Sequence, residues 1–121
     1  MKRIGLALAA IVAAIPQPGQ PAKPALPASS ATPADEALFV RKCAICHGAV
    51  GPGTIMLGRR LGKEHAMLAT RTDLDPAYIE GVVRGGLNSM PRFTRVELPD
   101  AQLAQVQRYL TRNNPKKGRR Q

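Results

Sequence analysis

The sequence predicts an all-α domain with three main helices and a short one. Proline follows a capping residue at Thr32–Pro33 and at Asp75–Pro76, a pattern typical of the first turn of a helix. Apolar residues recur at helical spacing near the C-terminus, at Leu103, Val106 and Leu110. No β-α-β pattern separates these segments.

The first helix is expected to run from Thr32 to about Cys46 and to end at Gly48. Phe39, Cys43 and Cys46 then lie on one face, at positions i, i+4 and i+7. Residues 48–75 form a long connection, in which residues 51–53 (Gly-Pro-Gly) are expected to make a turn.

The other helices follow in the second half of the chain. We expect one or two helical turns over 63–69, and a helix that begins at Pro76, buries Ile79, Val82 and Val83, and stops at Gly85–Gly86. After an extended segment over 87–99, a last helix should run to about Asn113 and pack against the first.

Residues 43–47, Cys-Ala-Ile-Cys-His, form a C-x-x-C-H motif, which indicates covalent attachment of a c-type haem. Cys43 and Cys46 would each add to one vinyl group, and His47 would bind the iron through a neutral imidazole nitrogen. A zinc site would need a second cysteine pair, and the chain has 2 cysteines. A haem-free dithiol redox protein is the alternative that remains open.

Met90 is the candidate for the second axial ligand of the iron. Pro91 disfavours helix at this point and stiffens the loop, which suits a weak thioether bond. Met56 is only nine residues from His47 and would have to cross the porphyrin on a short loop, and Met67 lies in an expected helical turn. His47 and Met90 together predict an electron carrier rather than an enzyme.

Three neighbours of the predicted site have open interpretations. The carbonyl group of Pro52 could accept a hydrogen bond from His47, or residues 51–53 could be an ordinary surface turn. Arg84 could reach a haem propionate or be solvated, and we expect His65 to be exposed rather than to bind iron.

The sequence predicts that the chain is divided into four segments. Residues 1–14 resemble an export signal, with Lys2 and Arg3 before an apolar run, and would be either cleaved or kept as a membrane anchor. Residues 15–31 are a Pro/Ala-rich linker, 32–113 the domain and 114–121 a basic tail. We therefore expect a periplasmic protein, tethered to the outer face of the cytoplasmic membrane if the signal stays uncleaved.

The charge predicts the kind of partner. The 121 residues have a formal net charge of +10, which favours association with acidic surfaces. Nucleic acid is not expected, because no stacking aromatic residues accompany the scattered lysines and arginines.

Over about Thr32 to Thr111 the chain resembles the class I (mono-haem) cytochrome c family. The matching positions are Phe39, the C-x-x-C-H-G run at 43–48, Gly51–Pro52, Gly85–Gly86, Met90–Pro91, Phe93 and Tyr109–Leu110. The resemblance implies an all-α fold around one covalent haem c, with the first and last helices in close contact.

The resemblance is greatest to the short bacterial members of this family, some of which are cytochrome subunits of periplasmic dehydrogenases. It implies redox partners such as a dehydrogenase, a terminal oxidase or another cytochrome. One position departs from the family pattern, because Asp35 stands where the family usually has the glycine that lets the two helices approach.

Overall fold

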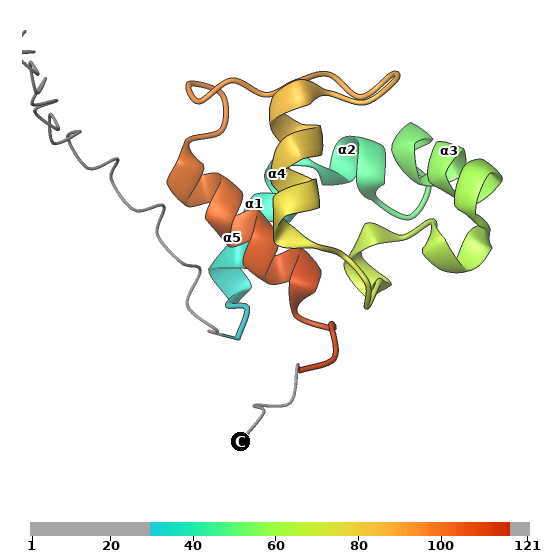
Figure 1. Cartoon of the computed structure of the whole chain (residues 1–121), viewed down its shortest axis with the longest axis horizontal. Helices are drawn as coiled ribbons and strands as arrows, with labels where there is room; N and C mark the ends of the chain where they lie inside the picture. The colour runs from blue at the N-terminus through green and yellow to red at the C-terminus, as the bar shows by residue number, and fades with distance from the viewer. Residues whose placement is uncertain (1–29, 117–121) are drawn as a thin grey trace, which may run out of the picture.

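Residues 30–116, the part of the chain that the computed structural model describes, fold into helices joined by loops (Figure 1). In chain order the elements are α1 (Pro33–Lys42), α2 (Ala44–His47), α3 (Pro52–Leu61), the 3₁₀ helices η1 (Lys63–His65) and η2 (Leu68–Thr70), α4 (Pro76–Gly85) and α5 (Asp100–Thr111). Over these residues the only β pairing is an isolated bridge between Leu87 and Met90. The prediction of an all-α fold is confirmed.

Part of the predicted segments lies outside the described residues. These are the export signal at 1–14, the linker up to residue 29 and the basic tail from residue 117. Within residues 30–116, no helix has the length and apolar content needed to cross a membrane.

α1 begins as predicted but ends earlier. The Thr32 side chain accepts a hydrogen bond from the backbone N–H of Asp35, and the Asp35 side chain accepts one from that of Thr32, which is a capping box. The predicted helix to Cys46 is wrong, because Cys43 leaves the helical conformation with φ −124°. α2 is therefore a separate turn with its own direction.

α1 and α5 pack against each other, as predicted, and cross in Figure 1. The rings of Phe39 and Tyr109 lie 5.1 Å apart between their centres. The polar side chain of Asp35 does not prevent this approach, because it is itself buried, with 0 % exposure, and bound to Arg108 of α5. The rest of the core is apolar and consists of Leu38, Leu74, Ile79, Val83, Leu98, Leu103, Val106 and Leu110.

α3 was not predicted, and the expectation of a mere turn at 51–53 is wrong. Gly51 is the N-cap and Pro52 takes the first helical position, where its missing N–H costs no hydrogen bond. The two 3₁₀ helices that follow correspond to the short helical turns predicted over 63–69.

α4 agrees with its prediction. The Asp75 carboxylate accepts hydrogen bonds from the N–H groups of Ala77 and Tyr78, at 2.8 and 3.0 Å. Ile79 and Val83 are buried, whereas Val82 is half-buried. Gly86 caps the helix with φ 76°, a conformation that favours glycine.

Candidate haem-binding site

The C-x-x-C-H motif occupies one tight turn. The N–H groups of Cys46 and His47 both donate to the carbonyl oxygen of Cys43, at 3.1 and 2.9 Å. Cys43 is half-buried against the core, Cys46 is exposed, and both thiols are free. α2 and its N-cap residue, Cys43, thus hold two thiols and one imidazole within five consecutive residues.

The ring of His47 is held against the start of α3. A Cβ atom added at Gly53 would lie 2.8 Å from Cε1 and 3.0 Å from Nδ1 of His47, so only glycine allows this approach. Nδ1 is buried and has no hydrogen-bond partner within residues 30–116. This arrangement leaves Nε2, the other ring nitrogen, as the atom to bind a metal.

The structure does not contain the predicted hydrogen bond between His47 and the carbonyl group of Pro52. Instead, the hydroxyl of Thr54, a buried residue, donates to the carbonyl oxygen of Gly48 at 2.7 Å. This bond ties α3 to the residue that follows His47, and so fixes the ring through packing.

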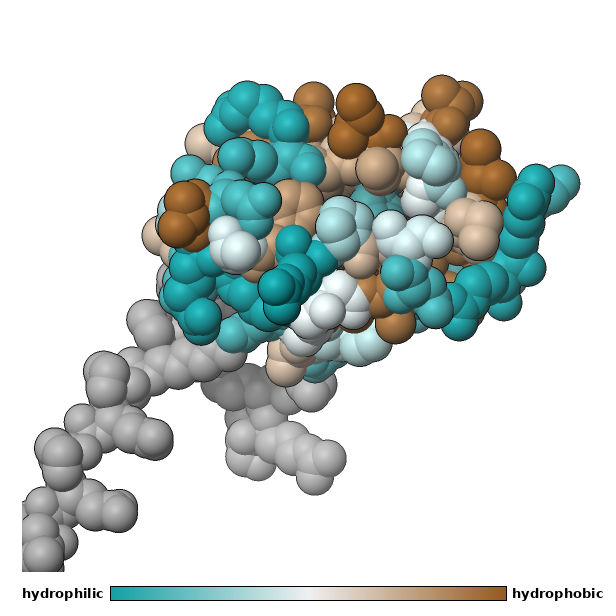
Figure 2. All heavy atoms as spheres, turned by 90° about the horizontal axis from the view of Figure 1, so that it is seen from above, coloured by the Kyte–Doolittle hydropathy of each residue, from teal (hydrophilic) through white to brown (hydrophobic). Residues whose placement is uncertain are grey.

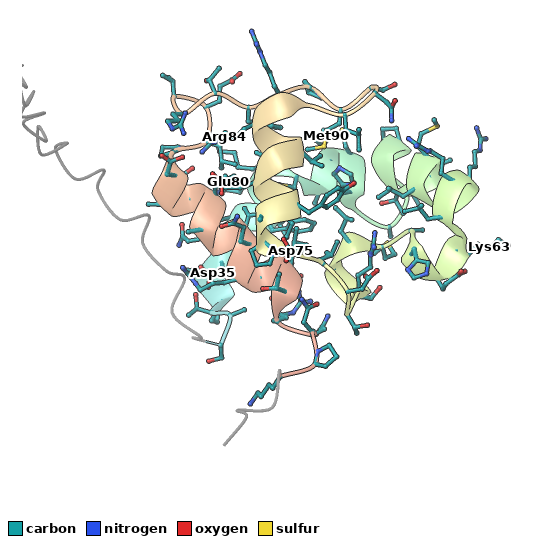
Figure 3. All side chains as sticks on the ribbon, in the orientation of Figure 1. Asp35, Lys63, Asp75, Glu80, Arg84 and Met90 are labelled. Atoms are coloured by element: carbon teal, nitrogen blue, oxygen red, sulfur yellow. The ribbon has the colours of Figure 1, made fainter. Side chains whose placement is uncertain are left out.

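Met90 ends a tight hairpin that projects from the C-terminal end of α4, and Figure 3 shows its side chain beside that helix. Leu87 and Met90 exchange two backbone hydrogen bonds, of 3.1 and 2.9 Å. Asn88 adopts φ 52° in the turn, a conformation that asparagine tolerates. The Met90 side chain is half-buried and packs against the core, as Cys43 does.

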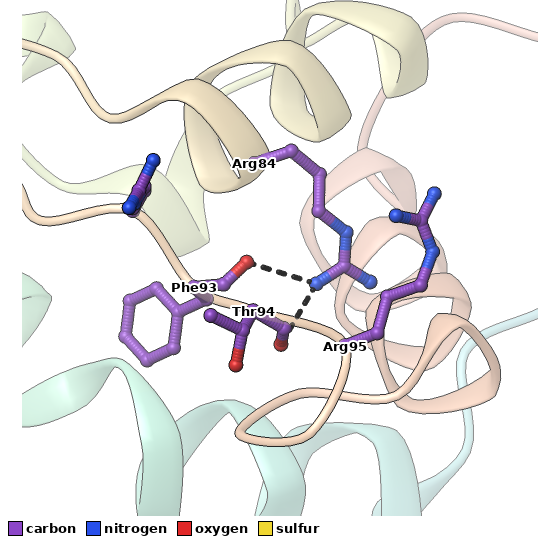
Figure 4. A pocket seen from close by; sticks show the side chains of 5 residues that line it. Arg84, Phe93, Thr94 and Arg95 are labelled. Atoms are coloured by element: carbon purple, nitrogen blue, oxygen red, sulfur yellow. Dashed lines mark hydrogen bonds between the residues drawn. The ribbon is translucent and has the colours of Figure 1, made fainter.

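Arg84 has a role that the sequence did not indicate. Its Nη1 donates to the carbonyl oxygens of Phe93 and Thr94, both at 3.2 Å (Figure 4). Its Nη2 donates to the carboxylate of Asp100 at 2.7 Å. The side chain of Arg84 is only 15 % exposed, so the interpretation of Arg84 as a solvated arginine is wrong. Its terminal nitrogens bind protein acceptors rather than projecting toward a propionate. An open pocket of about 310 Å³ is lined by Arg84, Arg92, Phe93, Thr94 and Arg95.

The other methionines and the second histidine lie elsewhere. Met56 is 48 % exposed on α3, and Met67 is half-buried just before η2. The His65 side chain is 44 % exposed and lies 3.9 Å from Glu64, so the expectation of an exposed histidine is confirmed.

Burial changes the protonation of the motif. It lowers the pKa of His47, which favours the neutral imidazole that can bind a metal. Burial, aided by the neighbouring Cys46, raises the pKa of Cys43 to about 11. Little Cys43 thiolate therefore exists near neutral pH in the chain without haem.

The residues fit a covalent haem. The motif supplies two free thiols and an imidazole whose inner nitrogen is buried, and exposed apolar side chains lie within it and close to it in the chain. Ile45 and Val50 are 84 % and 88 % exposed, and Leu87 of the hairpin is 46 % exposed. Figure 2 shows apolar side chains gathered along one edge of the molecule. A planar apolar group bound there would cover apolar surface that is otherwise exposed to water, which is unfavourable.

Comparison with known families agrees with this assignment. A family model described as cytochrome c oxidase, cbb3-type, subunit III matches residues 30–110. The chain belongs to this family. It is a cytochrome c domain, and family membership implies haem c and electron transfer.

A solved structure of p-cresol methylhydroxylase with substrate bound is also similar to this cytochrome c domain. The two share 31 % sequence identity with a TM-score of 0.47, over 64 % of this chain and 88 % of the other. A comparison with curated proteins found no match.

Proposed function

We propose that this cytochrome c domain is a periplasmic carrier of single electrons, with one haem c bound to Cys43 and Cys46 and with His47 and Met90 as the axial ligands. When bound, haem c would supply an iron that gains and loses one electron. The chain would take one electron from a reduced dehydrogenase and give it to an oxidised acceptor, either a terminal oxidase or another cytochrome.

The observation that carries this proposal is the environment of His47. Its Nδ1 is buried, Gly53 leaves room for the ring, and two free thiols lie within the same turn. A histidine with one buried nitrogen can present only the other to a ligand. Because two thiols lie next to this histidine, we infer a ligand with two positions that react with thiols.

The chain's residues would also control access to the metal. With His47 on one face and the Met90 thioether on the other, small molecules such as oxygen would have no free coordination position. Thioether ligation also stabilises reduced iron and so raises the reduction potential. Both effects favour electron transfer over catalysis.

Surface charge supports a partner with an acidic docking surface. Arg59, Arg60 and Lys63 lie at or just after the end of α3, are exposed, and make no ion pair within residues 30–116. Ile55 and Met56, on the same helix, are each 48 % exposed. Such a mixed basic and apolar surface suits brief, salt-sensitive association.

The haem-free dithiol alternative has weaker support. A thiol exchanges with disulfides only as the thiolate, and burial holds the pKa of Cys43 at about 11. We therefore expect Cys43 to be a poor nucleophile near neutral pH, which does not favour this alternative.

The test is to produce the full chain in a host that exports proteins and attaches haem c. We expect covalent haem on a denaturing gel, a reduced spectrum with a sharp α-band, and a sulfur-to-iron charge-transfer band in the oxidised protein. Cys43→Ala/Cys46→Ala should abolish the covalent haem. A colourless protein with free or bridged thiols would overturn the proposal.

Matched variants identify the axial ligands. His47→Ala should lose the native spectrum, whereas His65→Ala, at the other histidine of the chain, should retain it. Met90→Ala should lose the charge-transfer band, whereas Met56→Ala and Met67→Ala should keep it. A band that survives Met90→Ala would contradict the assignment of Met90.

A further inference from the structure

Met90 lies between two points where its loop is attached to α4. On one side, the hairpin to Leu87 starts directly after the helix and its cap at Gly86. On the other side, the Phe93 N–H donates to the carbonyl oxygen of Val83 at 2.7 Å. Because two residues separate Met90 from Phe93, the position of Met90 depends on how firmly Phe93 and Thr94 are held.

Arg84 provides the side-chain part of that attachment. Its guanidinium donates to the carbonyl oxygens of Phe93 and Thr94 and to the carboxylate of Asp100, the first residue of α5. One side chain from α4 therefore binds the loop, as Figure 4 shows, and also α5. Hydrogen bonds from a charged donor are stronger than those between neutral groups.

The carboxylate that Arg84 binds is shared with a second arginine. The Asp100 carboxylate also accepts a hydrogen bond from Nε of Arg95, at 3.0 Å. Arg84 is much less exposed than Asp100, at 15 % against 63 % for the side chains. The guanidinium is thus fixed by protein acceptors on two elements, rather than by solvent or by a bound anion.

We propose that Arg84 is a positioning residue for the Met90 sulfur: it holds the loop so that the thioether remains on the iron. This inference rests on the proposed His47/Met90 ligation. A thioether binds iron weakly. If the loop had to become ordered each time the bond formed, the entropy cost would cancel much of the free energy gained from the bond. By holding Phe93 and Thr94, Arg84 would reduce that cost.

The test measures how easily added imidazole replaces Met90 on the oxidised haem protein. Arg84→Gln removes the charged fork, and imidazole should bind about tenfold more tightly because the competing Met90-bound state is less populated. The reduction potential should fall, and the Phe93 amide should exchange its hydrogen faster. Arg84→Lys should recover part of each effect, since it keeps one charged donor.

Arg92→Gln is the matched control. Arg92 is exposed, lines the same pocket and makes no hydrogen bond or ion pair within the described residues. We expect wild-type imidazole affinity and potential. Should Arg84→Gln fail to accumulate, Asp100→Asn replaces it: the guanidinium keeps its carbonyl acceptors but loses its charged one, so imidazole binding should tighten by a smaller factor.

The outcomes separate this inference from the proposed function. A purely structural Arg84 would lower the free energy of unfolding but leave imidazole affinity and potential unchanged, which would overturn the inference alone. If Met90→Ala removes no charge-transfer band from the wild-type spectrum, the proposed ligation by Met90 is wrong. The positioning role of Arg84 is then wrong as well.

Discussion

The carboxylate of Asp35 on α1 accepts two hydrogen bonds from the guanidinium of Arg108 on α5, at 2.7 and 3.3 Å. Asp35 is fully buried, whereas the Arg108 side chain is 22 % exposed. The charged pair thus occupies the contact between α1 and α5. Helix packing here depends on a polar contact inside an apolar core.

Loss of this carboxylate should destabilise the domain strongly. Asp35→Ala leaves the Arg108 guanidinium without its acceptor, and breaking one partner of a buried pair costs about 3–5 kcal/mol. Chemical denaturation of the haem-loaded protein measures the change. Asp73→Ala is the control: Asp73 also pairs with an arginine, Arg71, but its side chain is 50 % exposed against 0 % for Asp35, so its loss should cost less.

The double variant Asp35→Ala/Arg108→Leu tests whether the two side chains stabilise the domain as a pair. Removing both charges leaves no unpaired charge, although the Thr32 N–H still loses its acceptor, so the double variant should be more stable than the sum of the single changes predicts. Additive losses would show that the two side chains stabilise the domain independently.

The same carboxylate should make stability depend on pH in acid. Burial acts to raise the pKa of Asp35, but hydrogen bonds from Arg108 and Thr32 outweigh it, so the pKa lies below the ordinary value of 3.8. As the pH falls below about 4, the unfolded chain binds a proton more readily than the folded one. Asp35 therefore contributes fully above that pH, and its contribution is lost on acidification.

This dependence can be measured as the difference in unfolding free energy between wild type and Asp35→Asn. The difference should be constant from pH 7 to 5 and shrink as the pH is lowered further. A difference that stays constant down to the acid limit of folding would rule out Asp35 as the titrating group.

Gly53→Ala should disturb the histidine. The new methyl group would approach Cε1 of His47 and the carbonyl oxygen of Cys46 to within 2.8 and 2.9 Å. Crowding of this kind costs about 1–3 kcal/mol, and the displaced ring should shift the haem spectrum and the potential. Both are read from a spectroscopic redox titration and a denaturation curve.

Gly81→Ala supplies the control for Gly53. Its added Cβ would meet nothing within 4 Å in α4, so it should stabilise the helix by about 0.5–1 kcal/mol. An unaltered potential in Gly53→Ala would mean that the close contact with His47 has no influence on the metal.

The basic end of α3 should determine how the rate of electron transfer depends on salt. Arg59→Gln/Arg60→Gln should slow reaction with an acidic redox partner by about tenfold at low ionic strength, and less as salt is added. Stopped-flow kinetics over a range of salt concentrations measures this effect. Arg41→Gln/Lys116→Gln removes the same charge elsewhere, and an equal loss in that variant would show that only net charge matters.

Local chemistry was enough to predict most helix starts and the main helix contact. Asp75 before Pro76 marked α4, and the apolar stripe of α5 marked its contact with α1. α3 escaped prediction because Gly-Pro-Gly favours a turn as strongly as a helix start. In the structure Gly53 packs closely on His47, a contact that the residue types alone did not indicate.

Other parts depend on contacts between distant residues. Arg84 binds acceptors 9, 10 and 16 positions further along the chain, and no spacing rule relates them. The break in the helix at Cys43 also has no local signal. The four residues predicted to hold haem could be named from the motif and from Pro91, but the arrangement that supports them could not.

The capping box of α1 has a consequence for fraying of the helix. Oδ2 of Asp35 accepts hydrogen bonds from both the Thr32 N–H and Nε of Arg108. The start of α1 and its ion pair with α5 therefore share one acceptor atom. If the first turn of α1 frays and Asp35 moves, the cap of the helix and part of its attachment to α5 are lost together.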